Sequence, residues 1–249
     1  MKNIISCQNS EIKKVYALRL AKERKKQNLF VAEGLRACIT LIESKAKLNT
    51  LYVTEKNIAI ISPYANEKKL CLVSPHVMQK ISQAATPSGI LGVFEMPPER
   101  NYSFLKNGLV ITHVSDPGNM GTLIRTAAAM NVDSVVIVEG ADPWSFKTVQ
   151  SSAGFITHVD IFQCPWSELI KHAEKNNINL AALVVANGKS PESISKKNTL
   201  LIVGSEAHGI PQTWLSDCTT KITLSMPGKI ESLNAAIAGS IAMYILFAQ

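Results

Sequence analysis

A glycine-containing loop in the middle of the chain carries an asparagine and an arginine at a spacing that suits ligand binding. In "SDPGNMGTLIRTAAAM", an Asp-Pro-Gly triplet turns the chain, Asn119 is able to cap the following helix, and Arg125 lies one to two turns inside it. The two side chains do not project from the helix in the same direction, but both can reach its N-terminal end. The plain alternative is a capped helix with a surface arginine.

A second loop, "LLIVGSEAHGIP", follows a run of apolar residues. Gly204 and Gly209 allow the backbone to approach a ligand closely, and Glu206 can accept hydrogen bonds from a cationic or amine-bearing one. The loop is neither a Walker P-loop, because no Gly-Lys-Ser/Thr follows, nor a dinucleotide fingerprint. For His208, an incidental loop histidine is a simpler interpretation than a ligand or a base.

A third loop, "SMPGKIESLNAAIA", leads into the apolar C-terminal segment. Ser232 and Asn234 flank the start of a helix, where free backbone N–H groups can bind polar groups. The segment after them is too short and too rich in Gly, Ser and Ala to span a bilayer, which takes about 20 apolar residues. A helix that is apolar all round is stable only when buried on several sides, so we predict that it lies at a subunit interface.

The elements that position these loops alternate between strand and helix. The first 96 residues predict a small α/β domain, and residues 97–107, which contain two consecutive prolines, predict a linker. Residues 108–249 predict a second α/β domain. Its strands are near-continuous runs of Val, Ile and Leu, which indicates a mainly parallel sheet covered on both faces. Ligands bind such sheets at the loops that leave the carboxyl ends of the strands, where all three loops occur.

The composition is that of a folded protein. The chain has 249 residues, of which 46% are hydrophobic and 18% charged, as in globular domains. A net charge of +7 favours a polyanionic partner such as nucleic acid, although many basic proteins bind none. The five cysteines include no CxxC pair, so we expect reduced thiols in a cytoplasmic protein, with no metal site.

The stretch "SEIKKVYALRLAKERKKQN", residues 10–28, predicts one helix with an excess of basic side chains. It is either a solvated surface or, as we favour slightly, a surface that contacts phosphates. The candidate RNA-binding residues are Lys13, Lys14, Arg19, Lys22, Arg24, Lys25 and Lys26.

Taken together, the loops resemble the SpoU/TrmH family of RNA 2'-O-ribose methyltransferases, in the SPOUT class. The three motifs that carry the resemblance are "DPGNMGTLIRTA", "LIVGSEAHGIP" and "MPGKIESLNAAIA". The N-terminal "LRLAKERKKQNLFVAEG" and "TPSGILGVF" are similar to the substrate-binding extension of many members. The resemblance covers nearly the whole chain.

This resemblance implies a SPOUT domain with a deep trefoil knot, S-adenosyl-L-methionine bound in the knot, and a homodimer formed through the same region. It implies methylation of a ribose 2'-hydroxyl in RNA, with ribosomal RNA as the expected substrate and no membrane partner. Two alternatives are a transfer RNA substrate and an RNA-binding or ribosome-assembly factor that has lost catalysis.

The resemblance also assigns site residues. The catalytic group would be Arg125, Asn119, Glu206, Ser232 and Asn234. The donor site would use Gly204, Glu206, Leu224, Met226, Leu233 and Asn234. Arg125 would act either as the base or as a group that orients the substrate phosphate: arginine is charged at ordinary pH, so the first role needs a strongly altered environment, whereas its planar fork suits the second.

Three positions depart from the family pattern. Ser225 stands where many members have proline, Gln150 where arginine is common, and Asn131 where glycine is frequent. The first two affect RNA contacts or loop stiffness, and none of the three removes a catalytic residue.

Overall fold

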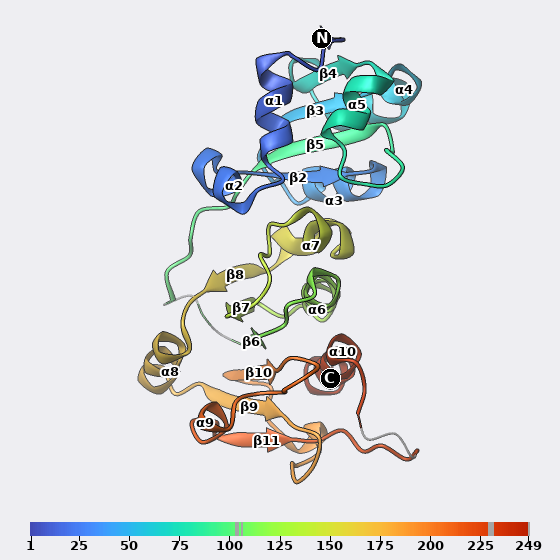
Figure 1. Ribbon diagram of the computed structural model, residues 1–249. Coiled ribbons are helices and arrows are strands. Elements are labelled where there is room, and N and C mark those ends of the chain that lie inside the picture. The colour runs from blue at the N-terminus through green and yellow to red at the C-terminus, as the bar shows by residue number, and fades with distance from the viewer. Residues whose placement is uncertain (103–104, 106, 229–231, 249) are drawn as a thin grey trace. The chain divides into compact units, whose positions relative to one another are not determined.

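The computed structural model describes residues 1–102, 105, 107–228 and 232–248, which form two compact units (Figure 1). The first unit comprises Met1–Pro98 and Asp142–Thr157, and the second comprises Glu99–Ala141 and His158–Gln249. The sequence assigned residues 142–157 to the second domain, whereas their contacts group them with the first unit. Helix α7 (Phe146–Ser151) of this segment packs on strand β2 (Leu29–Glu33), and the Trp144 ring lies 5.0 Å from the ring of Phe30.

The first unit is built on a five-stranded mixed sheet with strand order β1-β4-β3-β5-β2. Strands β1, β4 and β3 are parallel, and β5 runs antiparallel to both β3 and β2. Its elements are β1 (Lys2–Ile4), α1 (Ser10–Ala17), α2 (Ala21–Gln27), β2 (Leu29–Glu33), α3 (Leu35–Glu43), β3 (Leu48–Val53), α4 (Ile58–Ile61), β4 (Leu70–Val73), α5 (Pro75–Ile81), β5 (Ile90–Glu95) and α7 (Phe146–Ser151). The predicted small α/β domain is confirmed.

The predicted helix over residues 10–28 is two helices in the structure. Helix α1 ends at Ala17, and Leu20 adopts an extended conformation, with φ −92° and ψ 129°, before α2 begins. The break turns α2 away from the line of α1, so the basic side chains of residues 10–28 do not share one continuous helical face. Strand β1, which pairs with β4, was not predicted.

The second unit is built on a six-stranded sheet with strand order β11-β9-β10-β6-β7-β8, in which every pair is parallel. This confirms the predicted sheet. Its elements are β6 (Gly108–Thr112), α6 (Pro117–Ala129), β7 (Ser134–Val138), β8 (Asp160–Gln163), α8 (Trp166–Lys175), β9 (Asn179–Leu183), β10 (Thr199–Val203), α9 (Gln212–Leu215), β11 (Thr220–Ile222) and α10 (Ala235–Phe247). Short 3₁₀ turns along the chain are Glu55–Asn57, Ser62–Tyr64, Glu67–Lys69, Phe155–His158 and Pro191–Ser193.

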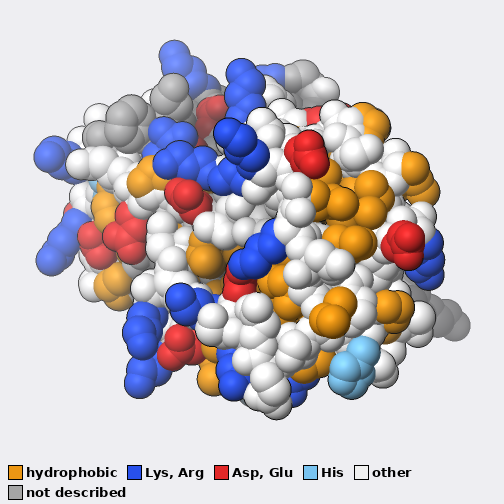
Figure 2. All heavy atoms as spheres, turned by 90° about the horizontal axis from the view of Figure 1, so that it is seen from above, with side chains coloured by type: hydrophobic (Ala, Val, Ile, Leu, Met, Phe, Trp, Pro, Cys, Tyr) orange, Lys and Arg blue, Asp and Glu red, His pale blue; other side chains and the backbone are white. Residues whose placement is uncertain are grey.

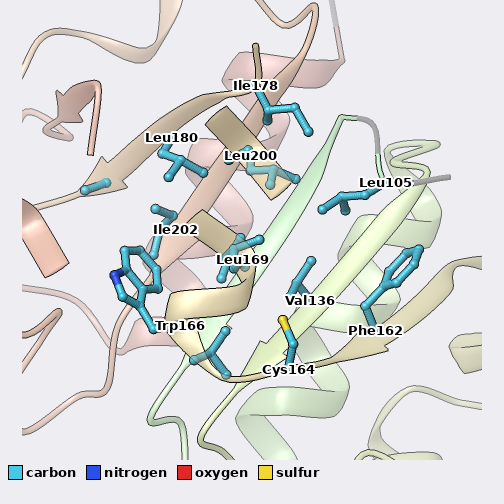
Figure 3. Close-up of a cluster of buried hydrophobic side chains, with 14 of the residues drawn as sticks. Leu105, Val136, Phe162, Cys164, Trp166, Leu169, Ile178, Leu180, Leu200 and Ile202 are labelled. Carbon is cyan, nitrogen blue, oxygen red and sulfur yellow. The ribbon is translucent and has the colours of Figure 1, made fainter. Parts of the chain in front are cut away.

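Buried side chains join this sheet to α8. Figure 3 shows Trp166 and Leu169 of α8 among side chains of the sheet such as Ile202 and Val136. The central strands β6, β7 and β10 are buried along their whole length, as a sheet covered on both faces requires.

Helices α6 and α10 pack side by side, and α10 also contacts β10 (Figure 1). Gly239 makes the close packing possible, because a Cβ atom there would lie 2.6 Å from Leu123 Cδ2 and 3.0 Å from Val203 Cγ2. The hydroxyl groups of Thr126 and Ser240 form a hydrogen bond of 2.9 Å between the two helices. Within the described part of the chain, no helix combines the length and the apolar character that a membrane span needs.

Candidate active site

The strand order of the second sheet reverses at β6, which has β7 on one side and β10 on the other. Chains leaving the carboxyl ends of these parallel strands diverge there and leave room for a ligand. The Thr112 hydroxyl at the end of β6 donates a hydrogen bond of 3.3 Å to the carbonyl of Val203 at the end of β10. The first and second loops therefore start from one point of the sheet.

Side chains from all three loops meet at this point. The Asn119 Nδ2 group donates to Glu206 Oε1, and Asn234 Nδ2 donates to Asn119 Oδ1 at 3.3 Å. Asn119 is half-buried, whereas Glu206 and Asn234 are exposed. The structure thus brings together three of the five residues that the sequence assigned to catalysis, in a chain of hydrogen bonds that fixes the orientation of each amide.

The prediction that Asn119 caps the following helix is wrong. Helix α6 begins at Pro117 and Asp116 is its cap: the Asp116 Oδ1 atom accepts a hydrogen bond of 2.9 Å from the Asn119 backbone N–H. Because Asp116 does the capping, the Asn119 side chain is available for Glu206. The second helix start follows the prediction, since Asn234 Oδ1 accepts hydrogen bonds from the backbone N–H groups of Ala236 and Ile237 at 3.0 and 3.2 Å.

A cavity of about 320 Å³ lies beside this hydrogen-bonded chain, between the ends of β9 and β10 and the start of α10. Predicted residues that line it are Gly204, Glu206, Leu224, Met226, Ser232 and Leu233. Asn234 and Arg125 are not among its lining residues. Lys229, Ile230 and Glu231, in the third motif, lie outside the described residues.

One wall of the cavity was not expected from the sequence: Leu183, Val184 and Val185 form it at the end of β9. The available signal was position, because the apolar run of residues 179–185 is typical of a buried parallel strand, and ligands bind at the carboxyl ends of such strands. Because all three side chains are apolar, their types do not indicate a binding site. His208, for which an incidental role was the simpler interpretation, also lines the cavity.

The backbone of the second loop approaches itself too closely for a side chain at Gly204. A Cβ atom there would lie 2.3 Å from the carbonyl carbon of Gly209. Two backbone hydrogen bonds close the loop, from the Ser205 N–H to the Gly209 carbonyl at 3.2 Å and from the Gly209 N–H to the Ser205 carbonyl at 3.0 Å. Gly209 has a φ of +64°, which glycine adopts without strain. The loop therefore presents bare backbone to the cavity.

Arg125 is an exposed side chain on α6. Among the described residues it has neither a hydrogen bond nor an ion pair, so its guanidinium is free to bind an anion. Ser232 is exposed at the cavity and precedes the α10 cap by two residues.

Of the departures from the family pattern, Asn131 adopts a left-handed conformation with φ 53°, which asparagine tolerates better than most residues.

The candidate RNA-binding residues divide by exposure. Those that are exposed are Lys13, Lys14, Lys22, Lys25 and Lys26. Arg19 is half-buried and donates to the backbone carbonyls of Lys80 and Ser82. Arg24 is only 5% exposed, and its guanidinium pairs with Asp142 and donates to two backbone carbonyls. Because Arg24 is buried and neutralised, its assignment to RNA contacts is wrong.

The five cysteines are free thiols. Burial raises the pKa of Cys38 to about 12 and the pKa values of Cys71, Cys164 and Cys218 to about 11. These four thiols stay protonated at neutral pH, and a protonated thiol is a poor nucleophile. In the ranges that the structure describes, no group of three or more His, Cys, Asp or Glu side chains is placed to hold a metal ion.

Comparisons with known proteins extend over the whole chain. The 23S rRNA (guanosine(2553)-2'-O)-methyltransferase RlmP of Bacillus subtilis is 29% identical over 99% of this chain and 99% of its own. The AdoMet-bound rRNA methyltransferase from Sinorhizobium meliloti superimposes with a TM-score of 0.86 at 25% identity, over 98% of this chain and 97% of the other. The SpoU methyltransferase AviRb from Streptomyces viridochromogenes has the same fold, with a TM-score of 0.84 at 22% identity over 97% of this chain and 98% of its own.

Models of two protein families match separate parts of the chain. The MRM3-like substrate binding domain matches residues 9–92, within the first unit. The SpoU rRNA Methylase family matches residues 106–244, more than half of the chain and all three loops of the candidate site. With the parallel sheet, the hydrogen-bonded loops and the cavity beside them, this match shows that the chain belongs to the SpoU rRNA methylase family.

Proposed function

We propose that the protein transfers a methyl group from S-adenosyl-L-methionine to a ribose 2'-hydroxyl of ribosomal RNA. The observation that carries the proposal is the chain of hydrogen bonds from Asn234 through Asn119 to Glu206 beside an apolar cavity. The hydrogen-bonded side chains form a polar group of fixed orientation, which suits a hydroxyl substrate. The cavity beside them suits a small organic donor. The names of the relatives in Bacillus subtilis and Sinorhizobium meliloti support ribosomal RNA as the substrate class.

The cavity residues fit S-adenosyl-L-methionine. Leu224, Met226 and Leu233 give apolar walls for an aromatic ring, and bare backbone at Gly204 offers peptide groups where no side chain fits. Glu206 places a carboxylate at the cavity, opposite in charge to a sulfonium or ammonium group. When bound, S-adenosyl-L-methionine supplies an activated methyl group whose transfer to oxygen is an in-line displacement.

Arg125 belongs to the substrate side of the site in this proposal. It is exposed, lies outside the cavity lining and has a free planar fork, which matches a phosphate of the RNA backbone. By holding that phosphate, Arg125 would place the ribose hydroxyl near the cavity. Acting as the base that takes the hydroxyl proton is the second role, and it requires loss of the guanidinium charge.

The proposal is tested by two measurements on the purified protein. We expect calorimetry to detect binding of S-adenosyl-L-methionine, and radiolabelled donor to transfer its methyl group to unmodified bacterial 23S rRNA. Absence of donor binding favours a ribosome-assembly factor without catalysis. Transfer to transfer RNA but not to 23S rRNA favours the alternative substrate. Mapping 2'-O-methyl positions in RNA from cells with and without the gene then identifies the nucleotide.

We also propose that the second unit carries the deep trefoil knot of the family and dimerises through α10, and that the protein works in the cytoplasm on newly made rRNA. One face of α10 supports the dimer: Ile237, Ile241 and Tyr244 are 52%, 39% and 63% exposed and recur at helical spacing. Its opposite face, including Ala242 and Met243, is buried within the unit.

A homodimer is therefore expected at micromolar concentration by light scattering. Burying an isoleucine side chain is worth roughly 1.5–3 kcal/mol, so charging the centre of the exposed face with Ile241→Glu should yield monomers. The matched control is Ile60→Glu, because Ile60 is 51% exposed but lies on α4 of the first unit. A monodisperse monomer for the parent protein would contradict the proposed interface.

A further inference from the structure

A groove between α1 and α5 in the first unit holds a cavity of about 550 Å³. We call it the α1–α5 groove. The side chains that matter are Gln8, Lys13, Tyr16, His76, Gln79 and Lys80. The volume falls in the range of roughly 300–1,000 Å³ that is typical of small-molecule sites, and is therefore large enough for one nucleotide.

The lining of the groove contains basic side chains and no acidic ones. It contains two lysines and a histidine but no aspartate or glutamate. Neither Lys13 nor Lys80 forms an ion pair with any residue in the described ranges, and the acidic residue at the start of α1, Glu11, is bonded to Lys2 and Tyr52. Figure 2, which views the molecule from above Figure 1, shows Lys and Arg side chains gathered towards one side of the view, with some Asp and Glu among them, and hydrophobic side chains towards the other. Uncompensated cations around one hollow attract a polyanion.

Arg19 adds a third cation and joins the two helices. Its Nη2 group donates to the carbonyls of Lys80 and Ser82 at the end of α5, so its hydrogen bonds go to backbone oxygens rather than to a carboxylate. The Arg19 guanidinium lies 4.4 Å from the centre of the Tyr16 ring, and the Lys80 ammonium lies 4.2 Å from it. Cations at these distances are attracted to an aromatic ring, so they fix the position of Tyr16.

Tyr16 is 38% exposed, and its hydroxyl has no hydrogen-bond partner in the part of the chain that the structure describes. A ring held in place by its neighbours offers this hydroxyl to a ligand at little entropic cost. Gln8 and Gln79 add exposed amides, which donate and accept hydrogen bonds as a nucleobase edge requires.

We propose that the α1–α5 groove is a binding site for one nucleotide of an unpaired RNA segment. Lys13 and Lys80 bind its phosphate, the Tyr16 hydroxyl bonds to the phosphate or sugar, and the two glutamines contact the base. The proposal rests on RNA as the substrate and names where the first unit holds it. Only Lys13 of these residues was expected from the sequence. Lys80, Gln8 and Gln79 lie outside the basic stretch, and Tyr16 lies within it but is not basic.

The test compares two double variants in binding a short fluorescein-labelled single-stranded RNA, measured by anisotropy over a range of salt concentrations. We expect the groove variant Lys13→Ala with Lys80→Ala to bind about tenfold more weakly, and its slope of log affinity against log salt to be shallower by roughly 0.7 for each lysine. The control variant, Lys68→Ala with Lys69→Ala, removes two exposed lysines of the same unit outside the groove, and should change affinity less than twofold.

Equal loss in both double variants would mean that affinity follows total charge, which overturns the groove assignment, as would unchanged binding in the groove variant. Competition by poly-L-glutamate as effective as competition by RNA would overturn the assignment to a nucleotide. Donor binding and methyl transfer are measured on the same samples. A parent protein that methylates RNA while its groove variant binds normally refutes the groove alone, whereas groove-dependent RNA binding without donor binding refutes the proposed function alone.

Discussion

Arg125→Ala is expected to lower the rate of methyl transfer about a hundredfold or more while leaving the affinity for S-adenosyl-L-methionine within about twofold. The structural reason is that Arg125 lies apart from the residues that would bind the donor. Arg125 is exposed on α6 and is not among the residues that line the cavity, so truncating it removes no donor contact. It removes the free guanidinium that would hold the RNA phosphate.

The measurements are single-turnover methyl transfer to rRNA and, separately, donor binding by calorimetry. Arg125→Lys sharpens the result, because lysine keeps the charge but loses the bidentate fork, and we expect it to remain well below the parent rate. Transfer by Arg125→Ala at the parent rate would remove Arg125 from the catalytic group. If Arg125→Ala loses activity only because it no longer binds the donor, Arg125 belongs to the donor side of the site and not to the substrate side.

Asn234→Ala should instead weaken donor binding and methyl transfer together, each by about tenfold or more. Asn234 Oδ1 caps α10 through two backbone N–H groups, and Asn234 Nδ2 bonds to Asn119. Replacing an asparagine cap with alanine typically costs about 1 kcal/mol of stability, and here the helix start also borders the cavity. The lost bond to Asn119 frees the amide that donates to Glu206, so both sides of the site lose their alignment.

Asn234→Asp separates these two causes. Aspartate caps a helix as well as asparagine does, so the free energy of unfolding should stay near that of the parent, but a carboxylate cannot donate to Asn119 Oδ1. We therefore expect Asn234→Asp to keep its stability in thermal unfolding and still lose methyl transfer. If Asn234→Asp retains the parent activity, the bond between the two asparagines has no role and the cap alone explains the alanine variant.

The strands could be predicted because burial leaves a strong pattern. A strand covered on both faces must be apolar throughout, as β6, β7 and β10 are, and parallel pairing follows from the intervening helices. Positions within loops were less predictable. Asp116 and Asn119 are both suitable caps, and only the backbone geometry of α6 selects Asp116.

Arg24 shows the same limit for charge. Within a basic stretch it looks like its neighbours, yet it is buried against Asp142, a residue more than a hundred positions away in the chain. No local pattern encodes such a partner. The same holds for the β9 wall of the cavity, where Leu183 and Val185 serve a site through shape rather than through polar chemistry.

The grouping of residues 142–157 with the first unit has a consequence for how the gene can be divided. The chain passes from one unit to the other after Pro98, after Ala141 and after Thr157, so neither unit is a single continuous stretch of sequence. A fragment that begins at residue 108 takes Asp142 and Trp144 away from Arg24 and Phe30, their partners in the intact protein. A substrate-binding module from a relative can therefore replace the first unit only if it also accommodates α7, which packs on β2.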